Sequence, residues 1–135
     1  MNKLINIACW SVGEHAIRNI LPAIQECKNI NLSGIYTRDQ NVSNEQNNLY
    51  GSTQYQSEAE LLSALNVDAV YLSSPTGVHY EQINKCLDAG KSVLVEKTAL
   101  PCLKKTQELI SKAESKGLTI MEAFMYRFHK QFTEL

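Results

Sequence analysis

Long apolar runs, closely spaced cysteines and a surplus of basic residues are all absent from this 135-residue chain. Because no apolar run approaches about 18 residues, we expect no membrane span. The four cysteines are far apart and form no C-x-x-C pair, which favours small buried side chains in a reducing, cytoplasmic setting and indicates no metal site. Residues 2–3 lead directly into an apolar run, so no signal peptide is expected. The formal net charge of −1 provides no basic footprint for nucleic acid.

Glycine is missing where a dinucleotide-binding turn would need it. The apolar run 4–8 leads into ACWSVG, where G-x-G-x-x-G is typical of such a turn. Only Gly13 remains, because Ala8 and Trp10 occupy the other two glycine positions. Since the glycines let the backbone approach a pyrophosphate closely, Ala8 is a small loss and Trp10 a large one. From this turn alone, the alternative is a Rossmann-like fold that binds no dinucleotide.

Short apolar runs alternate with amphipathic stretches along the whole chain, whose length suits one domain. We expect strands at 4–8, 31–37, 52–55, 68–74, 91–96 and 118–123. We expect helices at 13–27 (bent or restarted at Pro22), 57–65, 79–90, 101–117 and 124–135, with a weak helix or a loop at the Asn-rich 39–50. Nearly continuous apolar strands indicate a parallel sheet that is buried on both faces. The pattern predicts an α/β, doubly wound Rossmann sheet of order 3-2-1-4-5-6 with helices on both faces.

Two S-x-x-E patterns, at Ser57 and at Ser11, predict capping boxes at helix starts. The second would begin a helix near Val12, directly after the first strand. The free N–H groups of such a start lie at the positive end of the helix dipole, which suits a pyrophosphate. The candidate cofactor contacts of this turn are Ala8, Trp10, Ser11, Val12 and Gly13.

The end of the second predicted strand indicates which dinucleotide is preferred. Proteins that prefer NAD usually carry an Asp or Glu there, bonded to the ribose 2′-hydroxyl. Here Thr37 takes that place and Arg38 follows. An arginine binds a 2′-phosphate with charge-assisted bonds, each worth roughly 1.5–3 kcal/mol, and so favours NADP. The alternative is a solvated Arg38 paired with Asp39.

Three stretches together resemble the Gfo/Idh/MocA oxidoreductases, the glucose–fructose oxidoreductase and inositol dehydrogenase family. They are DAVYLSSPTGVHYEQINKCLDAGKSVLVEKT (68–98), the Thr37-Arg38 pair, and GLTIMEAFMYRFH (117–129). Similar proteins act on sugars, nucleotide sugars, polyols and dihydrodiols with NAD(P). The resemblance therefore implies the NADP-binding N-terminal half of an oxidoreductase that transfers hydride to or from a sugar, nucleotide sugar or polyol.

The resemblance also implies cofactor contacts after the fourth predicted strand. The family pattern a-t-P-x-x-x-H corresponds to Ser73, Ser74, Pro75, Thr76 and His79. It implies that the backbone of the first four residues lines the cofactor and that His79 begins the next helix close to it. A histidine that begins the helix and bonds only locally is the alternative.

The family's E-K-P sequence stands here as Glu96-Lys97-Thr98. In similar enzymes this lysine lies near the nicotinamide ribose and the reacting carbon, so the resemblance implies that Glu96 and Lys97 contact the cofactor and that Lys97 is catalytic. A partly buried ammonium there would polarise a carbonyl or relay a proton, and burial would lower its pKa. Thr98 departs from the family's proline and leaves φ unrestrained, so the backbone beside Lys97 is less constrained than in the family. The alternative is a surface lysine.

An aromatic-Arg pair beside the nicotinamide is implied at Tyr126 and Arg127, whereas the other aromatic residues nearby favour a core or an interface. Similar proteins continue into a substrate domain. We therefore expect a cofactor domain at 1–122, and a linker or helix at 123–135 that leads toward an absent C-terminal domain. We expect this chain alone to be inactive, and its exposed segment to drive homo-oligomerisation or to detach as a tail. The alternative function is a non-catalytic nucleotide-binding module, or a subunit completed by a partner chain.

Overall fold

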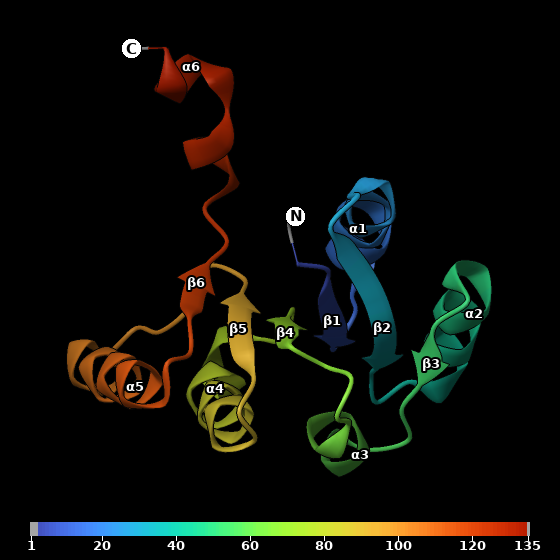
Figure 1. The fold of residues 1–135 in the computed structure, drawn as a ribbon, viewed down its shortest axis with the longest axis horizontal. Helices are drawn as coiled ribbons and strands as arrows, with labels where there is room; N and C mark the ends of the chain where they lie inside the picture. Colours follow the sequence, from blue (N-terminus) through green and yellow to red (C-terminus); the bar gives the residue numbers. More distant parts are fainter. Residues whose placement is uncertain (1–2, 135) are drawn as a thin grey trace.

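A six-stranded parallel sheet of order β3-β2-β1-β4-β5-β6 forms the centre of the molecule (Figure 1). The computed structural model describes residues 3–134. The strands are β1 Ile5–Trp10, β2 Ile30–Tyr36, β3 Thr53–Gln54, β4 Ala69–Leu72, β5 Ser92–Val95 and β6 Ile120–Glu122. The strand order and the parallel pairing confirm the predicted doubly wound fold.

Helices cover both faces of this sheet. They are η1 Ala16–Ile20, α1 Leu21–Glu26, α2 Gln40–Tyr50, α3 Glu58–Ser63, η2 Thr76–Val78, α4 His79–Asp88, α5 Leu103–Lys116, η3 Met125–Phe128 and α6 Lys130–Thr133. Figure 1 shows α1 and α2 on one face and α3, α4 and α5 on the other. Along β1 the side chains alternate, so that Ala8 and Trp10 join the core beneath α3 and α4 whereas Ile7 and Cys9 join the core beneath α1. Burial on both sides explains the nearly continuous apolar strands.

The first helix begins two residues later than expected. Helical turns start at Glu14, and the Gly13 carbonyl accepts from the Ile17 amide at 3.0 Å. The predicted capping box at Ser11 is wrong, because Ser11 has φ 64° and its amide donates to the Tyr36 carbonyl. An N-cap residue needs an extended backbone, which this left-handed turn excludes. The π-helical segment η1 precedes Pro22, so the helix restarts there as predicted.

Residues 40–50 form a full helix, although their composition predicted only a weak helix or a loop. Asp39 caps α2 by accepting from the amides of Asn41 and Val42. The buried face of α2 is polar, and the side chains of Ser43 and Asn47 donate to the Ile35 carbonyl of β2. These hydrogen bonds replace the apolar contacts that a periodicity pattern would detect.

The last segment leaves the sheet after β6 and projects away from the body of the molecule (Figure 1). The single helix predicted for 124–135 is broken at His129, which has an extended backbone between η3 and α6 and accepts from the Gln131 amide. No described residue after Ala123 is buried. A short helix without a packing surface is marginal, which explains the break. Residue 135 lies outside the described part.

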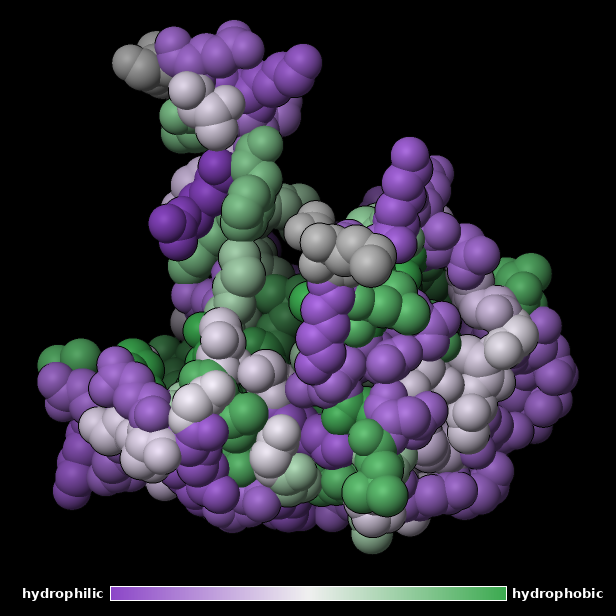
Figure 2. Space-filling model, viewed as in Figure 1, coloured by the Kyte–Doolittle hydropathy of each residue, from purple (hydrophilic) through white to green (hydrophobic). Residues whose placement is uncertain are grey.

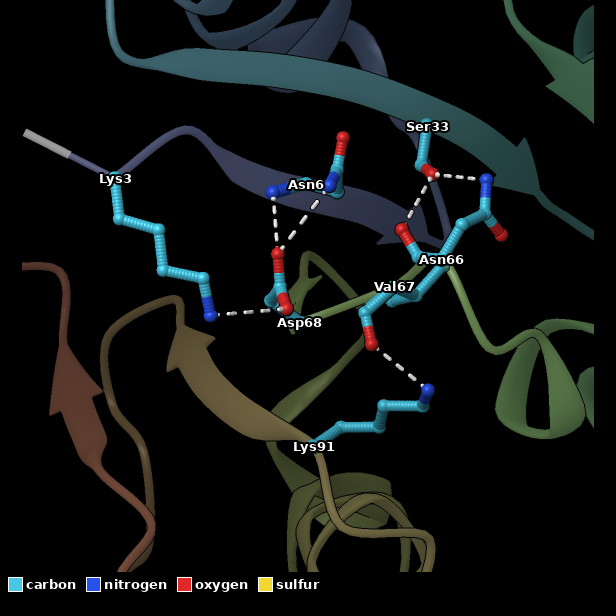
Figure 3. A network of polar contacts seen from close by, with 7 residues as sticks. All are labelled: Lys3, Asn6, Ser33, Asn66, Val67, Asp68 and Lys91. Carbon is cyan, nitrogen blue, oxygen red and sulfur yellow. Dashed lines mark hydrogen bonds and ion pairs between the residues drawn. The ribbon is translucent and has the colours of Figure 1, made fainter.

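A polar network ties strand starts together at the amino edge of the sheet (Figure 3). The Asp68 carboxylate accepts from the Asn6 amide at 2.9 Å and lies 3.9 Å from the Lys3 ammonium. Buried Lys91 donates to the carbonyls of Ala64 at 2.5 Å and Val67 at 2.8 Å. These contacts lie at the end of the strands opposite to the candidate site and have a structural role.

Among residues 3–134, no helix is long and apolar enough to cross a membrane. Within the same residues, no three His, Cys, Asp or Glu side chains are grouped so that they could hold a metal ion.

Candidate cofactor-binding site

A pocket of about 270 Å³ opens at the carboxyl edge of the sheet, where β1 lies between β2 and β4. It is lined by Trp10, Ser11, Tyr36, Arg38, Glu58, Pro75, Val78, Glu81, Gln82 and Lys85. The strands that follow β1 in the chain are added first on one side of it, as β2 and β3, and then on the other side, as β4, β5 and β6. Open parallel sheets bind ligands at the point where the strand order reverses in this way, which is called the switch point. Four residues singled out in the sequence therefore meet in one pocket.

Trp10 lines this pocket, and its side chain is packed into the core of the protein. Its side chain is 3% exposed and belongs to the core beneath α3 and α4. Its ring centroid lies 6.4 Å from that of Tyr36, with the planes tilted by 58°. Pro75 and Val78 add further apolar side chains to the lining of the pocket.

Arg38 lies exposed at the rim, directly after buried Thr37. The expected alternative, an ion pair with Asp39, does not form, because the Asp39 carboxylate caps α2. Among the described residues Arg38 takes part in no ion pair. Its charge is therefore available to a ligand.

The side of the pocket formed by α3 and α4 carries two carboxylates and one ammonium. The Lys85 ammonium lies 2.8 Å from Glu58 Oε1 and 2.9 Å from Glu81 Oε1. The hydrogen bonds that Lys85 donates to Glu58 and then to Glu81 raise the pKa of Lys85 above its ordinary range. Because Lys85 is paired with both carboxylates, Arg38 is the cation of the pocket that has no ion-pair partner among the described residues. The sequence analysis missed this set, although residues 78, 81, 82 and 85 have the spacing of one helix face.

The loop after β4 reaches the pocket through one residue of the predicted set. Pro75 is extended, with φ −60° and ψ 145°, and lines the pocket. Ser74 is buried and its hydroxyl donates to Gln82. The Ser73 amide donates to the Trp10 carbonyl. Thr76 begins the short η2 turn and is not among the lining residues.

His79 is separated from the pocket. Its side chain is buried, and both ring nitrogens face backbone carbonyls of this chain. His79 is not among the residues that line the pocket, and its contacts are not only local, because Thr98 and Ala99 belong to the loop after β5. The reason is tertiary: α4 packs its first turn against the loop that follows β5.

Glu96 and Lys97 lie at the end of β5, in different surroundings. Glu96 is half-buried, and its Oε1 accepts from the Tyr71 hydroxyl at 2.6 Å and lies 3.5 Å from His15 Nε2. Lys97 is exposed, which corrects the expectation of a partly buried ammonium. The Lys97–Thr98 peptide bond is cis.

A second hollow, of about 230 Å³, surrounds Lys97 and is lined by Ala123, Phe124, Met125 and Tyr126 as well. Tyr126 and Lys97 thus line the same hollow. Arg127 is exposed and is not among the lining residues. Three predicted positions remain. Ala8, in β1, and Val12, in the turn after it, are buried. Gly13 is exposed, with open space around it.

Residues 7–124 match the family described as "Oxidoreductase family, NAD-binding Rossmann fold". The chain belongs to this Gfo/Idh/MocA family. It is 34% identical over 114 residues to D-xylose 1-dehydrogenase (NADP(+)) 2 of Haloferax volcanii, covering 84% of this chain and 35% of that protein. It is 31% identical over 116 residues to scyllo-inositol 2-dehydrogenase (NADP(+)) IolU of Bacillus subtilis, covering 85% of this chain and 35% of that protein.

The solved structures agree with this membership of the Gfo/Idh/MocA family. The 3-ketoreductase KijD10 of Actinomadura kijaniata, in complex with TDP-benzene and NADP, superposes with a TM-score of 0.93 at 29% identity. That match covers 98% of this chain and 42% of KijD10. The chain thus spans well under half the length of these relatives and corresponds to their NAD(P)-binding Rossmann portion.

Proposed function

We propose that this chain is the NADP(H)-binding domain of an oxidoreductase that transfers hydride to or from a carbon of a sugar, nucleotide sugar or polyol. The observation that carries the proposal is Arg38. It lies at the rim of the switch-point pocket, without a carboxylate partner among the described residues, where NAD-preferring proteins carry an acid. The names of the relatives, which include NADP(+)-dependent xylose and inositol dehydrogenases, support the substrate class.

The residues present fit such a dinucleotide. The pocket lined by Trp10, Tyr36 and Pro75 would hold the adenine, and Arg38 would bind the 2′-phosphate. The first amides of the helix that begins at Glu14 have no partners within the helix and would bind the pyrophosphate. Lys97 and Tyr126 would flank the nicotinamide end.

The chemistry requires a group that acts on the substrate oxygen. Bound nicotinamide supplies or accepts the hydride. Lys97 is exposed beside the hollow formed with Tyr126, where its side chain would donate a hydrogen bond to the oxygen of the reacting carbon and polarise it. Glu96, held by Tyr71 and His15, fixes the strand end from which Lys97 extends.

One observation favours the alternative of a module that is completed by another chain. Lys97 is exposed beside a hollow that it forms with residues of the segment after β6, so these residues alone do not enclose a substrate. Alignment of substrate and cofactor is worth several kcal/mol of an activation barrier and needs an enclosed site. Binding of cofactor without turnover of any sugar is the expected result for the isolated chain under either reading.

The test uses the single tryptophan, Trp10, which lines the pocket. Titration with NADPH should quench its fluorescence saturably, and NADP should reverse the quenching by competition. N-acetyl-tryptophanamide at the same absorbance controls for light absorbed by the nucleotide, and Lys97→Ala should bind NADPH with nearly unchanged affinity. A linear, unsaturable decrease identical to that control would refute dinucleotide binding.

A further inference from the structure

His79 has an unusual set of contacts for a histidine at the start of a helix. Its side chain is 1% exposed. Nε2 lies 2.7 Å from the Ser74 carbonyl oxygen, and Nδ1 lies 3.1 Å and 3.0 Å from those of Thr98 and Ala99. All three partners are backbone acceptors, so any hydrogen bond among these contacts is donated by the ring. One side chain thus contacts two separate loops.

The two loops are those that carry the proposed chemistry. One follows β4 and includes Pro75 of the cofactor pocket, and the other follows β5 and includes Lys97. The strands pair as far as Leu72 and Val95, and the Glu96 amide adds a bond to the Leu72 carbonyl at 2.9 Å. Beyond that bond, among the described residues, the link between the loops is the His79 ring.

The loop that bears Lys97 is held on its other side as well. Glu122, at the end of β6, accepts from the Ala99 amide at 2.5 Å. Glu96 is held by Tyr71, so the backbone on both sides of Lys97 is anchored. These two anchors hold the Lys97 backbone in place, although the Lys97 side chain is exposed and Thr98 replaces the family's proline.

We propose that His79 is a positioning residue that clamps the Lys97 loop to the cofactor loop, so that Lys97 and a ligand bound against Pro75 keep a fixed separation. The meaning for catalysis rests on the proposed function, whereas the clamp itself consists of contacts within this chain. Removal of the ring should free the 97–99 loop while leaving the pocket walls at Trp10, Tyr36 and Arg38 in place.

The clamp is tested in the free protein by hydrogen exchange at the Ala99 amide, which is bonded to Glu122. In His79→Leu this amide should exchange roughly tenfold faster relative to the core amides of β4, as expected for the loss of a buried hydrogen bond. The matched control is Cys86→Ala, a change at a fully buried residue in the second half of the same helix. It should raise exchange uniformly. His79→Gln, which keeps an amide donor, should restore part of the protection.

A second readout separates positioning from mere stability. NADPH should shift the backbone NMR signals of both Thr76 and Lys97 in the unmodified chain. In His79→Gln the Thr76 shift should persist and the Lys97 shift should shrink. If neither variant changes Ala99 exchange relative to Cys86→Ala, the clamp is refuted. If NADPH does not bind but Ala99 responds, the clamp stands and the proposed function fails. Should His79→Leu fail to fold, His79→Gln decides by the same exchange measurement.

Discussion

The Tyr71 hydroxyl donates a 2.6 Å hydrogen bond to Oε1 of Glu96, the residue directly before Lys97. Tyr71 lies in the middle of the sheet, on the face covered by α1, and is fully buried. Burial first, and then the Glu96 carboxylate, raise the pKa of Tyr71 far above its ordinary value of 10. A buried phenol therefore orients the carboxylate at the end of β5.

Replacing Tyr71 by phenylalanine should lower the free energy of unfolding at neutral pH by about 1.5–3 kcal/mol, the usual contribution of a hydrogen bond to a charged group. Because the folded pKa is raised, the stability due to this tyrosine is complete below about pH 10 and is lost as the pH rises further. Tyr71→Phe should therefore show a shallower alkaline loss. Urea unfolding at about pH 7 and about pH 10.5 measures this. Tyr50→Phe is the control, and equal slopes for both variants would contradict the assignment.

Asp68 should make the fold sensitive to acid. The Asn6 amide is the main cause that lowers the Asp68 pKa below its ordinary value of 3.8 (Figure 3). Its stabilisation is therefore present above about pH 4 and lost as the pH falls through the lowered folded value. Asp68→Asn should cost about 0.5–1.5 kcal/mol at neutral pH, and the difference should shrink as the pH falls through the lowered folded pKa. Lys3→Ala removes only an exposed partner and should change little. A deficit that persists in acid would point to packing.

Trp10 should contribute to stability in spite of its position in a glycine place of the motif. Its side chain is 3% exposed within the core beneath α3 and α4. Trp10→Ala should lower the free energy of unfolding by about 3–5 kcal/mol, as large-to-small core changes do. Leu65→Ala, at a side chain that is 100% exposed, should change it little. Denaturant unfolding followed by circular dichroism measures both, and equal small effects would place Trp10 outside the core.

Features set by neighbouring residues were predictable from the sequence, and features set by distant ones were not. The Ser57 cap, where the Glu60 amide donates to the Ser57 hydroxyl at 3.1 Å, depends on four consecutive residues. The same pattern at Ser11 fails because the carbonyl of Tyr36, on another strand, takes its amide. The sequence predicted α2 only weakly because its buried face is polar. Asn47, for example, donates to the Ile35 carbonyl of β2 and does not pack as an apolar side chain would.

The candidate site divides in the same way. The motif positions of Arg38 and Pro75 placed them correctly in one pocket, because strand order alone brings their loops together. The exposure of Lys97 and the burial of His79 depend on how the loop after β5 packs between α4 and β6. No local pattern encodes that packing.

The projecting segment should cause self-association. Tyr126 lies 5.7 Å from Phe124 and 5.4 Å from Phe132 between ring centroids, and Phe128 is 68% exposed. Contiguous apolar surface of this kind usually binds a partner. Figure 2 shows it as green patches on the arm that stands clear of the body.

Light scattering over a range of concentrations should show oligomers of the chain and monomers of a version that ends at Glu122. Phe128→Ser should weaken the association, whereas Leu103→Ser, at an exposed residue of α5, should not. A strictly monomeric full chain would show that this surface does not mediate self-association.

The most direct test of the account is the cofactor preference of Arg38→Ala. Arg38 is the pocket cation that has no carboxylate partner among residues 3–134, so its removal should weaken NADPH binding roughly tenfold or more and leave NADH binding nearly unchanged. Arg18→Ala, at an exposed arginine on η1 that pairs with Glu14, is the matched control and should leave both affinities unchanged. Dissociation constants measured by calorimetry for both nucleotides decide the question. Equal weakening of NADPH and NADH, or unmodified chain that binds NADH at least as tightly as NADPH, would contradict the assignment of this pocket to NADP.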